Sequence, residues 1–406
     1  MVHRLGVLFV FGCHLLAHSG TYSAISEYGL PSPGSDPMSV TVGADGALWL
    51  AEYSGNRIGR VTTAGAITEY PVPTADAGPQ FITAGPDGAL WFTESLAGKI
   101  GRISTAGVIT EYSIPRSSPS GITAGPDGNL WFTDPPGKIG SMTTAGVLVA
   151  RYYLPNPASE PIQIAAGPDG ALWFTDATNY IGRITTSGAL TTYGVPTLGS
   201  YPDGITSGPD GALWFTEYET SKIGRITTGG VIAEYRIKPM ATPLTIVSGP
   251  DGALWFTNTA ANTIGRVTTS GVISQYPTQG TPSGTSGITG GPDGALWYTQ
   301  GDASEAGRAP ACGLGLNASF AGGTLTAHFD LGIDTSARFN VEVQNSDGPM
   351  GDPVSKEIPI VVPPQTFSMS WNQLSNAGQV TVKAQLAAPG GGAEVCAEWT
   401  TVSTTE

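Results

Sequence analysis

Short runs of β-branched and aromatic residues alternate with turns rich in glycine and aspartate along most of this 406-residue chain. In one representative stretch the pattern predicts four strands, at 81–84, 89–93, 99–104 and 108–112. The first two are joined by Gly85-Pro86-Asp87-Gly88, whose Asp-Gly pair is typical of a tight hairpin turn. The stretch therefore predicts a small antiparallel sheet, whose strands we label a to d.

The same unit recurs with almost constant length, and one tryptophan marks strand b of every copy. These residues are Trp49, Trp91, Trp131, Trp173, Trp214, Trp255 and Trp297. Their spacings are 42, 40, 42, 41, 41 and 42 residues. Seven units of this size predict an all-β fold, a seven-bladed β-propeller, with the tryptophans packed between blades.

The last copy is incomplete, and the first residues of the repeat region supply what it lacks. After the degenerate strand c at Ala306-Gly307-Arg308 no strand d follows, whereas residues 24–28 match the strand d pattern. We therefore expect the N-terminal strand to complete blade seven and close the ring, which removes two exposed sheet edges.

Residues 310–406 break the repeat and predict a second domain. Short strands are expected over 324–330, 337–343, 356–362, 366–371, 379–386 and 394–401. This pattern is typical of an immunoglobulin-like β-sandwich. Cys312 and Cys396 are the two cysteines outside the N-terminal segment, and we expect them to form a disulfide.

The N-terminal segment and the composition bound the location and the partners. Residues 1–19 carry Arg4, an apolar run from Leu5 to Ala17 and a small-residue cleavage site, which predicts a signal peptide. The predicted domains are thus 1–19, 20–309 and 310–406, in a secreted or periplasmic protein; lipid attachment at Cys13 is the weaker alternative. The net charge of −14, with 18 Lys and Arg, argues against a nucleic-acid partner. No later stretch is apolar enough for a membrane helix, and we expect a monomer.

Strand direction divides the propeller loops into two sets. The a–b and c–d turns, which barely vary, share one side, here called the turn face; the d–a links and b–c loops share the other, the link face. Variable loops on a rigid scaffold usually carry binding. On the link face, the residues that follow the start of strand a should ring the mouth of the central channel: Met38, Gln80, Ser120, Ile162, Asp203, Leu244 and Ser286.

Acidic residues recur at the end of strand b, three positions after each tryptophan. Glu52, Glu94, Asp134, Asp176 and Glu217 occupy this position in blades one to five. They could pair with the strand c arginines, such as Arg102, or those arginines could pair with strand d glutamates, such as Glu111. Alternatively, Asp176, Asp203 and Glu217 could hold Mg²⁺ or Ca²⁺, with Asp203 or Glu217 as general base. A solvated turn residue is the simpler interpretation of Asp203.

The repeat units GPDGALWFTE and KIGRITTAGVITEY resemble those of the virginiamycin B lyase (streptogramin lyase) family over about residues 22–308. The resemblance implies a seven-bladed propeller that opens cyclic depsipeptides by elimination, with Mg²⁺ and a histidine base. The positions of the family histidines correspond to Leu244 and Ser286, and those of two glutamates to Gly284 and to Gln300 or Gly301. The four histidines, His3, His14, His18 and His328, all lie outside the repeats.

Two functions stay open at this point. The first is an exported binding module that holds a small molecule, peptide, glycan or protein on the link face without the family's histidine-dependent chemistry. The second is a metal-assisted lyase or lactonase that uses carboxylates at the channel mouth.

Overall fold

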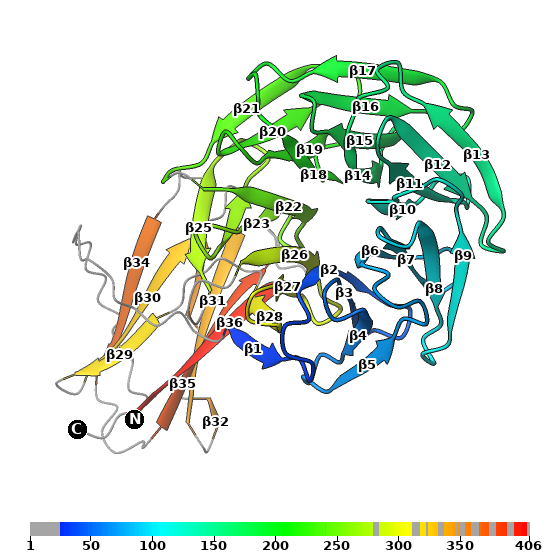
Figure 1. The fold of residues 1–406 in the computed structure, drawn as a ribbon. Helices are drawn as coiled ribbons and strands as arrows, with labels where there is room; N and C mark the ends of the chain where they lie inside the picture. The colour runs from blue at the N-terminus through cyan, green and yellow to red at the C-terminus, as the bar shows by residue number, and fades with distance from the viewer. Residues whose placement is uncertain are drawn as a thin grey trace. The chain divides into compact units, whose positions relative to one another are not determined.

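The computed structural model describes residues 25–239, 241–278 and 284–310, together with eight strands between 317 and 403. The contacts divide the chain into two compact units, of which Ser26–Ala309 is the larger. This larger unit consists of seven four-stranded antiparallel sheets around a common axis, so the predicted propeller is confirmed (Figure 1).

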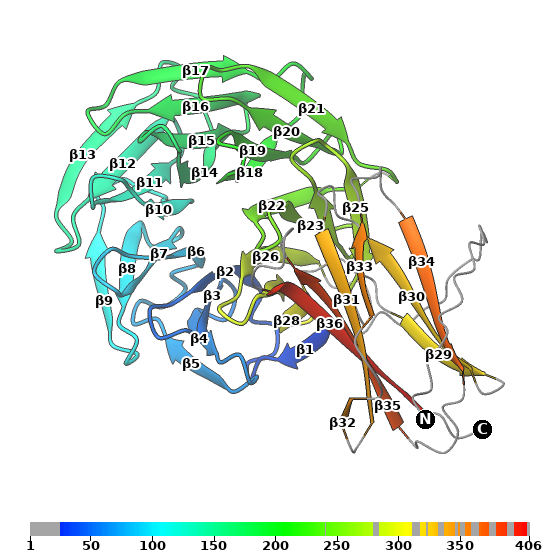
Figure 2. The same ribbon diagram turned by 180° about the vertical axis from the view of Figure 1, so that it is seen from behind.

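Strand a of each blade lies nearest the axis and strand d lies outermost (Figures 1 and 2). The strands a are β2 (Pro37–Val42), β6 (Pro79–Ala84), β10 (Ile122–Ala124), β14 (Pro161–Ala166), β18 (Pro202–Ser207), β22 (Pro243–Ser248) and β26 (Thr285–Gly290). The strands b are β3 (Leu48–Glu52), β7 (Leu90–Glu94), β11 (Leu130–Asp134), β15 (Leu172–Asp176), β19 (Leu213–Glu217), β23 (Leu254–Asn258) and β27 (Ala295–Gln300). The strands c are β4 (Arg57–Val61), β8 (Lys99–Ile103), β12 (Lys138–Met142), β16 (Tyr180–Ile184), β20 (Lys222–Ile226), β24 (Thr263–Val267) and β28 (Glu305–Pro310). The strands d are β5 (Ile67–Pro71), β9 (Ile109–Ser113), β13 (Leu148–Tyr153), β17 (Leu190–Gly194), β21 (Ile232–Arg236), β25 (Ile273–Pro277) and β1 (Ser26–Gly29).

Blade seven combines the two ends of the repeat region. Strand β1 pairs antiparallel with β28, with Ser26 opposite Arg308 and Gly29 opposite Glu305. The following amide, that of Leu30, donates to the carbonyl of Ser304 at 2.8 Å. The N-terminal strand therefore closes the ring as the sequence predicts.

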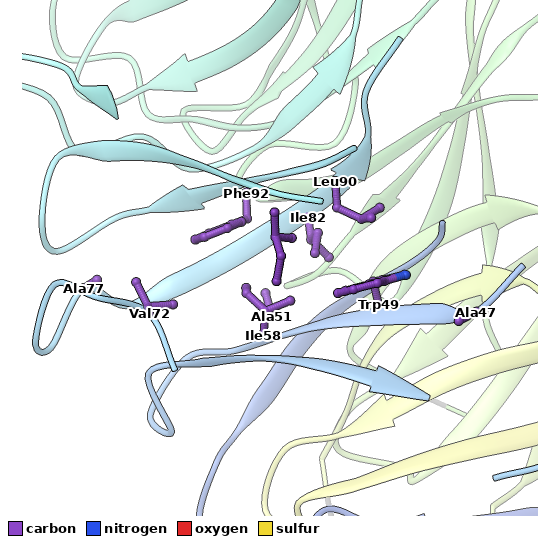
Figure 3. Packing of buried hydrophobic residues seen from close by; sticks show 10 residues of the cluster. Ala47, Trp49, Ala51, Ile58, Val72, Ala77, Ile82, Leu90 and Phe92 are labelled. Carbon is purple, nitrogen blue, oxygen red and sulfur yellow. The ribbon is translucent and has the colours of Figure 1, made fainter. Parts of the chain in front are cut away.

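The core of the propeller lies between neighbouring blades. Between blades one and two, Trp49 and Ile58 face Leu90 and Phe92, and all four are fully buried (Figure 3). Equivalent clusters lie between other blades, and every repeat tryptophan is at most 2% exposed. Full burial of such side chains is worth about 1.5–3 kcal/mol each, so the repeated tryptophan is a main source of stability.

The glycine of strand c makes room for the strand b phenylalanine of the same blade. A Cβ on Gly101 would lie 2.1 Å from the ring of Phe92, closer than any real contact of this kind. The turn glycine Gly107, at φ +85°, makes room in the same way for the ring of Tyr70 from the preceding blade. These close approaches explain why the IGR and TTAG segments keep their glycines.

The smaller unit contains the strands that follow the propeller. They form a three-stranded sheet of order β29-β30-β34 and a second sheet of order β32-β31-β35-β36, with β33 beside β31. Their bounds are Asn317–Ala321, Thr324–Leu331, Ala337–Asn345, Gly348–Pro349, Val354–Ile358, Gln365–Asn372, Gln379–Ala387 and Glu394–Ser403. Five of the six strands expected here are present, and β33 overlaps the sixth, expected over 356–362, at residues 356–358; β29 and the very short β32 were not expected.

Several predictions fall outside the described residues. They include the signal peptide at 1–19 and one partner of the expected disulfide, Cys312; the other, Cys396, lies in β36. Both stay predictions. Within the described part of the chain, no helix has the length and hydropathy needed to cross a membrane.

Candidate functional site

The inner strands bring the expected channel-mouth residues to the axial end of the link face. In blade five, Pro202 pairs with Glu217, the register then shifts, and regular pairing resumes at Ile205. Asp203 and Gly204 lie in this irregularity. The same shift occurs in six of the seven blades, so it is a property of the repeat rather than of one blade.

Threonine hydroxyls fix the backbone of the channel-mouth residues from the neighbouring blade. Thr175 Oγ1 donates to the carbonyl of Asp203 at 2.5 Å, and Thr216 Oγ1 donates to that of Leu244 at 2.7 Å. Each hydroxyl also accepts from an amide of its own blade; for Thr216 the donor is Gly204 N at 2.8 Å. The threonine of WFT thus ties adjacent blades together, a role that its recurrence in the repeat could have suggested.

The seven residues predicted to ring the channel mouth lie at or just before the starts of the inner strands, and they differ in burial. Ser120, Asp203 and Ser286 are at most 9% exposed. The other four are partly buried: Met38, Gln80, Ile162 and Leu244. Asp203 is the only charged residue in any of the seven inner strands.

Asp203 is a buried acid rather than the solvated turn residue that the sequence favours. The residue is 8% exposed; no hydrogen bond between described side chains or amides ends on its carboxylate, whose oxygens keep some contact with solvent. Burial raises its pKa to about 7. It therefore changes charge near neutral pH, which suits a general base or a site for a cation.

The strand b carboxylates lie inside their blades instead of lining an exposed rim. Glu52, Glu94 and Glu217 are fully buried. Burial, followed by the charges of Glu69 and Glu111, raises the pKa of Glu52 and of Glu94 to about 8. Burial therefore favours the protonated form of these two carboxyl groups, which lie inside their blades rather than at the surface.

The strand d glutamates hold the links between blades. Glu111 accepts from the amide and the hydroxyl of Thr74, both at 3.0 Å, and pairs with Lys99 at 3.2 Å. Glu234 binds Thr197 and Lys222 in the same arrangement. The basic partner is thus the first residue of strand c, and the expected pairing of these glutamates with the strand c arginine is wrong.

Blades four and six keep the strand c arginine, but they have Thr192 and Gln275 where other blades have the strand d glutamate. The pairing of that glutamate with the first residue of strand c explains this difference. Blade four has Tyr180 where blade two has Lys99, and blade six has Thr263 there. Without a cation at that position no glutamate is needed. In blade six Gln275 keeps the link function, because its Nε2 donates to the carbonyl of Lys238 at 3.1 Å.

The strand c arginines bind the turn face instead. Arg102 Nε donates to Asp87 Oδ2 at 2.7 Å, and Trp91 Nε1 donates to Asp87 Oδ1 at 3.0 Å. Cross-strand register gives the reason, because Arg102 lies opposite Trp91 while Lys99 lies opposite Glu94. The prediction that the arginines pair with the strand b carboxylates is therefore wrong. Blade three has Ser141 in place of the arginine, and there Asp127 binds Asn129 and Trp131.

The three carboxylates proposed as metal ligands are not brought together. Asp176 Oδ1 accepts from the amides of Glu160 and Thr178, at 3.0 Å each, and from the Thr178 hydroxyl at 2.7 Å. Glu217 faces Glu234 within blade five, which contributes to its raised pKa of about 7 after burial. Among the described residues, no three His, Cys, Asp or Glu side chains lie together as a metal site requires. These residues therefore do not fit a Mg²⁺ or Ca²⁺ centre.

Two tyrosines in the link-face loops of blade five, one of them two residues before Asp203, were not singled out from the sequence. Tyr201 and Tyr218 have ring centroids 6.1 Å apart and planes inclined at 57°. Their only sequence signal is that Tyr201 stands directly before the proline that begins strand a, where no other blade has an aromatic residue.

Fold and site together define a seven-bladed propeller with one buried acid among its axial residues. Residues 14–177 and 118–314 match the model of the virginiamycin B lyase family, and the chain belongs to this family.

Solved structures agree with this assignment. A streptogramin B lyase is 42% identical, with a TM-score of 0.67 over 70% of this chain and 96% of that chain. Virginiamycin B lyase from Staphylococcus aureus is 43% identical, with the same TM-score over 70% and 98%. A catalytically inactive variant of that enzyme, solved with quinupristin, is 42% identical.

Two further comparisons are more limited. Virginiamycin B lyase from Bacillus licheniformis is 48% identical over 41 residues, which is 10% of this chain and 14% of that protein. The extracellular domain of a hybrid two-component system from B. thetaiotaomicron is similar in fold alone, at 11% identity. Its TM-score is 0.59 over 93% of this chain and 57% of that one.

Proposed function

We propose that this chain is a binding member of the virginiamycin B lyase family that holds its ligand at the axial end of the link face. The observation that carries the proposal is the chemistry of the channel-mouth ring. Where the family resemblance places catalytic histidines, this chain has Leu244 and Ser286. A leucine side chain cannot move a proton, so the ring is better suited to holding a ligand than to the family's elimination.

The ligand classes follow from the link face. Its loops differ from blade to blade, and a small molecule, a peptide, a glycan or a protein loop could reach the ring. Since a relative was solved with quinupristin, a type B streptogramin is the first ligand to test.

A second candidate is a lyase or lactonase in which Asp203 acts as the base. One observation favours it: burial raises the pKa of Asp203 to about 7, which suits proton abstraction near neutral pH. In this candidate Asp203 would act without Mg²⁺, because Asp176 and Glu217 are engaged elsewhere.

One experiment separates the two candidates. Purified protein is incubated with a type B streptogramin and Mg²⁺, and the mixture is followed by chromatography and mass spectrometry, while binding is measured by calorimetry. Binding with no product supports the binding module. A product of unchanged mass indicates elimination, and one water added indicates a lactonase; either would contradict the binding proposal, and its loss in Asp203→Asn would identify the base.

We propose that residues 310–406 form an immunoglobulin-like sandwich, that Cys312 and Cys396 form a disulfide, and that the chain is exported. The two sheets support the sandwich, as does the fold similarity that covers 93% of this chain, more than the propeller alone can supply. The signal-like segment at 1–19 supports export. Mass analysis of the mature protein with and without reductant tests the cleavage and the disulfide together.

A further inference from the structure

We propose that blade five carries a subsite for an organic ammonium group, formed by Asp203 and the paired rings of Tyr201 and Tyr218. This inference rests on the proposed function, since it names the chemical class that the link face would recognise. The occupant is a primary or substituted ammonium group on a larger ligand.

Asp203 supplies the first argument. It is more than nine-tenths buried, it is the only charged side chain of the inner strands, and no described residue donates a hydrogen bond to its carboxylate. Its oxygens are not fully enclosed, unlike those of Glu94, so a cation from outside can reach this poorly hydrated carboxylate and would be stabilised by it. Its backbone is fixed by Thr175 of the neighbouring blade, so the group is held in place without being neutralised.

The tyrosine pair supplies the second argument. The rings come from two loops of the link face, which are joined where the amide of Tyr218 donates to the carbonyl of Tyr201 at 3.2 Å. Tyr201 has φ +51°, a conformation that bulky side chains rarely adopt. At the same position blades one, two and seven have Asp36, Gly78 and Gly284, which tolerate it better. Such an unfavourable conformation is typical of functional positions.

The charge around these rings decides the class of ligand. Burial, then the charges of Asp203, Glu160 and Glu219 in that order, raise the pKa of Tyr201, so three acidic residues act electrostatically on this phenol. Within the described part of the chain, none of the three forms an ion pair with a lysine or arginine. Aromatic faces and unpaired carboxylates attract an organic cation and repel an anion. A divalent metal fits less well, because no three acidic side chains here come close enough together to ligate it.

The test uses benzylammonium as the probe and benzyl alcohol as its neutral counterpart, with the full-length protein at neutral pH and binding followed by ligand-observed NMR. Benzylammonium is expected to bind at least tenfold more tightly than benzyl alcohol. Asp203→Asn is expected to remove that preference, and Tyr218→Leu to weaken binding severalfold. Asp76→Asn, which removes an exposed charge from the same face in another blade, is expected to leave binding unchanged.

Three outcomes would overturn the inference: equal binding of the two probes, unchanged binding by Asp203→Asn in a protein of normal thermal stability, or saturable Mg²⁺ binding that depends on Asp203. If benzylammonium fails while a streptogramin binds the same protein, the subsite is refuted and the proposed binding function stands. If the streptogramin and both probes fail, the subsite is refuted and a type B streptogramin is excluded as the ligand of the link face.

Discussion

Acidic side chains on the turn face and on the link face of the same blade have opposite environments. On the turn face of blade two, Asp87 accepts hydrogen bonds from Trp91 and Arg102, and its charge is fully used. On the link face of that blade, Glu94 is buried beside the charged Glu111 and stays neutral. On the turn face, each such aspartate is hydrogen-bonded to neighbouring side chains, and this arrangement recurs with little change from blade to blade. The link face instead contains acids such as Glu52 and Glu94, whose pKa values are raised by burial.

Variation between blades is tolerated on the link face more than on the turn face. The turn-face unit of aspartate and tryptophan occurs in all seven blades, and its arginine in six. On the link face each blade departs in its own way: blade three has Arg151 on strand d, blade four Tyr180 on strand c, and blade five Asp203 on strand a. The stabilising contacts of the turn face thus recur in all blades, while the residues that differ chemically between blades lie on the link face.

The largest effect is expected from breaking the core that supports both ends. Trp91→Ala removes a fully buried ring that stacks on Tyr112 at 5.6 Å, and it leaves Asp87 without one donor. We expect a loss of about 3–5 kcal/mol of unfolding free energy, measured by chemical denaturation. Leu96→Ala, at a 65% exposed position, is the control. A loss in Trp91→Ala no larger than in the control would contradict the assignment of this tryptophan to the inter-blade core.

The link face is expected to respond to pH in a way that the turn face does not. Burial and the charge of Glu111 raise the pKa of Glu94 from 4.5 to about 8. Between those pH values the folded chain holds a proton that the unfolded chain has released, so stability falls as pH rises. Glu94→Gln imitates the protonated form. It should leave stability unchanged near pH 5 and raise it near pH 8, by on the order of 2 kcal/mol.

Thermal or chemical denaturation at the two pH values checks this prediction. The control is Asp76→Asn, which alters an exposed acid on the same face and should show no such difference. If Glu94→Gln destabilises the protein near pH 8, Glu94 is charged in the folded state and the contrast between the two faces disappears.

The sequence predicted the propeller because its signal is periodic. Tryptophan spacing set the number of blades, and the unmatched strands at the two ends predicted closure through Ser26–Gly29. The position of Asp203 in an inner strand was also predictable, since it follows the proline that begins strand a. Repetition gives the position of each residue along a blade, and that was enough for the fold.

The side chains' surroundings were not predictable in the same way. Position alone placed Glu94 and Glu217 on the link face, but whether a carboxyl turns outward or into its own blade depends on cross-strand register. Register also decides that Arg102 meets Asp87 rather than Glu94 or Glu111. Tyr201 was missed because its signal is a single substitution at a position that no motif marks.

The smallest effect uses a natural difference within the turn face. Asp87→Ala removes the hydrogen-bond acceptor of Trp91 and Arg102. Blade three has Ser141 in place of the arginine, so Asp127→Ala removes the acceptor of Trp131 and Asn129 instead. We expect a loss of about 1–3 kcal/mol for Asp87→Ala and clearly less for Asp127→Ala, by chemical denaturation at neutral pH.

The difference between these two variants should also depend on pH. Burial alone would raise the pKa of Asp87, but the hydrogen bonds from Trp91 and Arg102 lower it. Its contribution is therefore present above the ordinary aspartate pKa and lost as pH falls through the lowered value. The difference between the two variants should accordingly shrink in acid; equal losses at every pH would mean that the arginine adds nothing and that the tryptophan bond alone holds the turn.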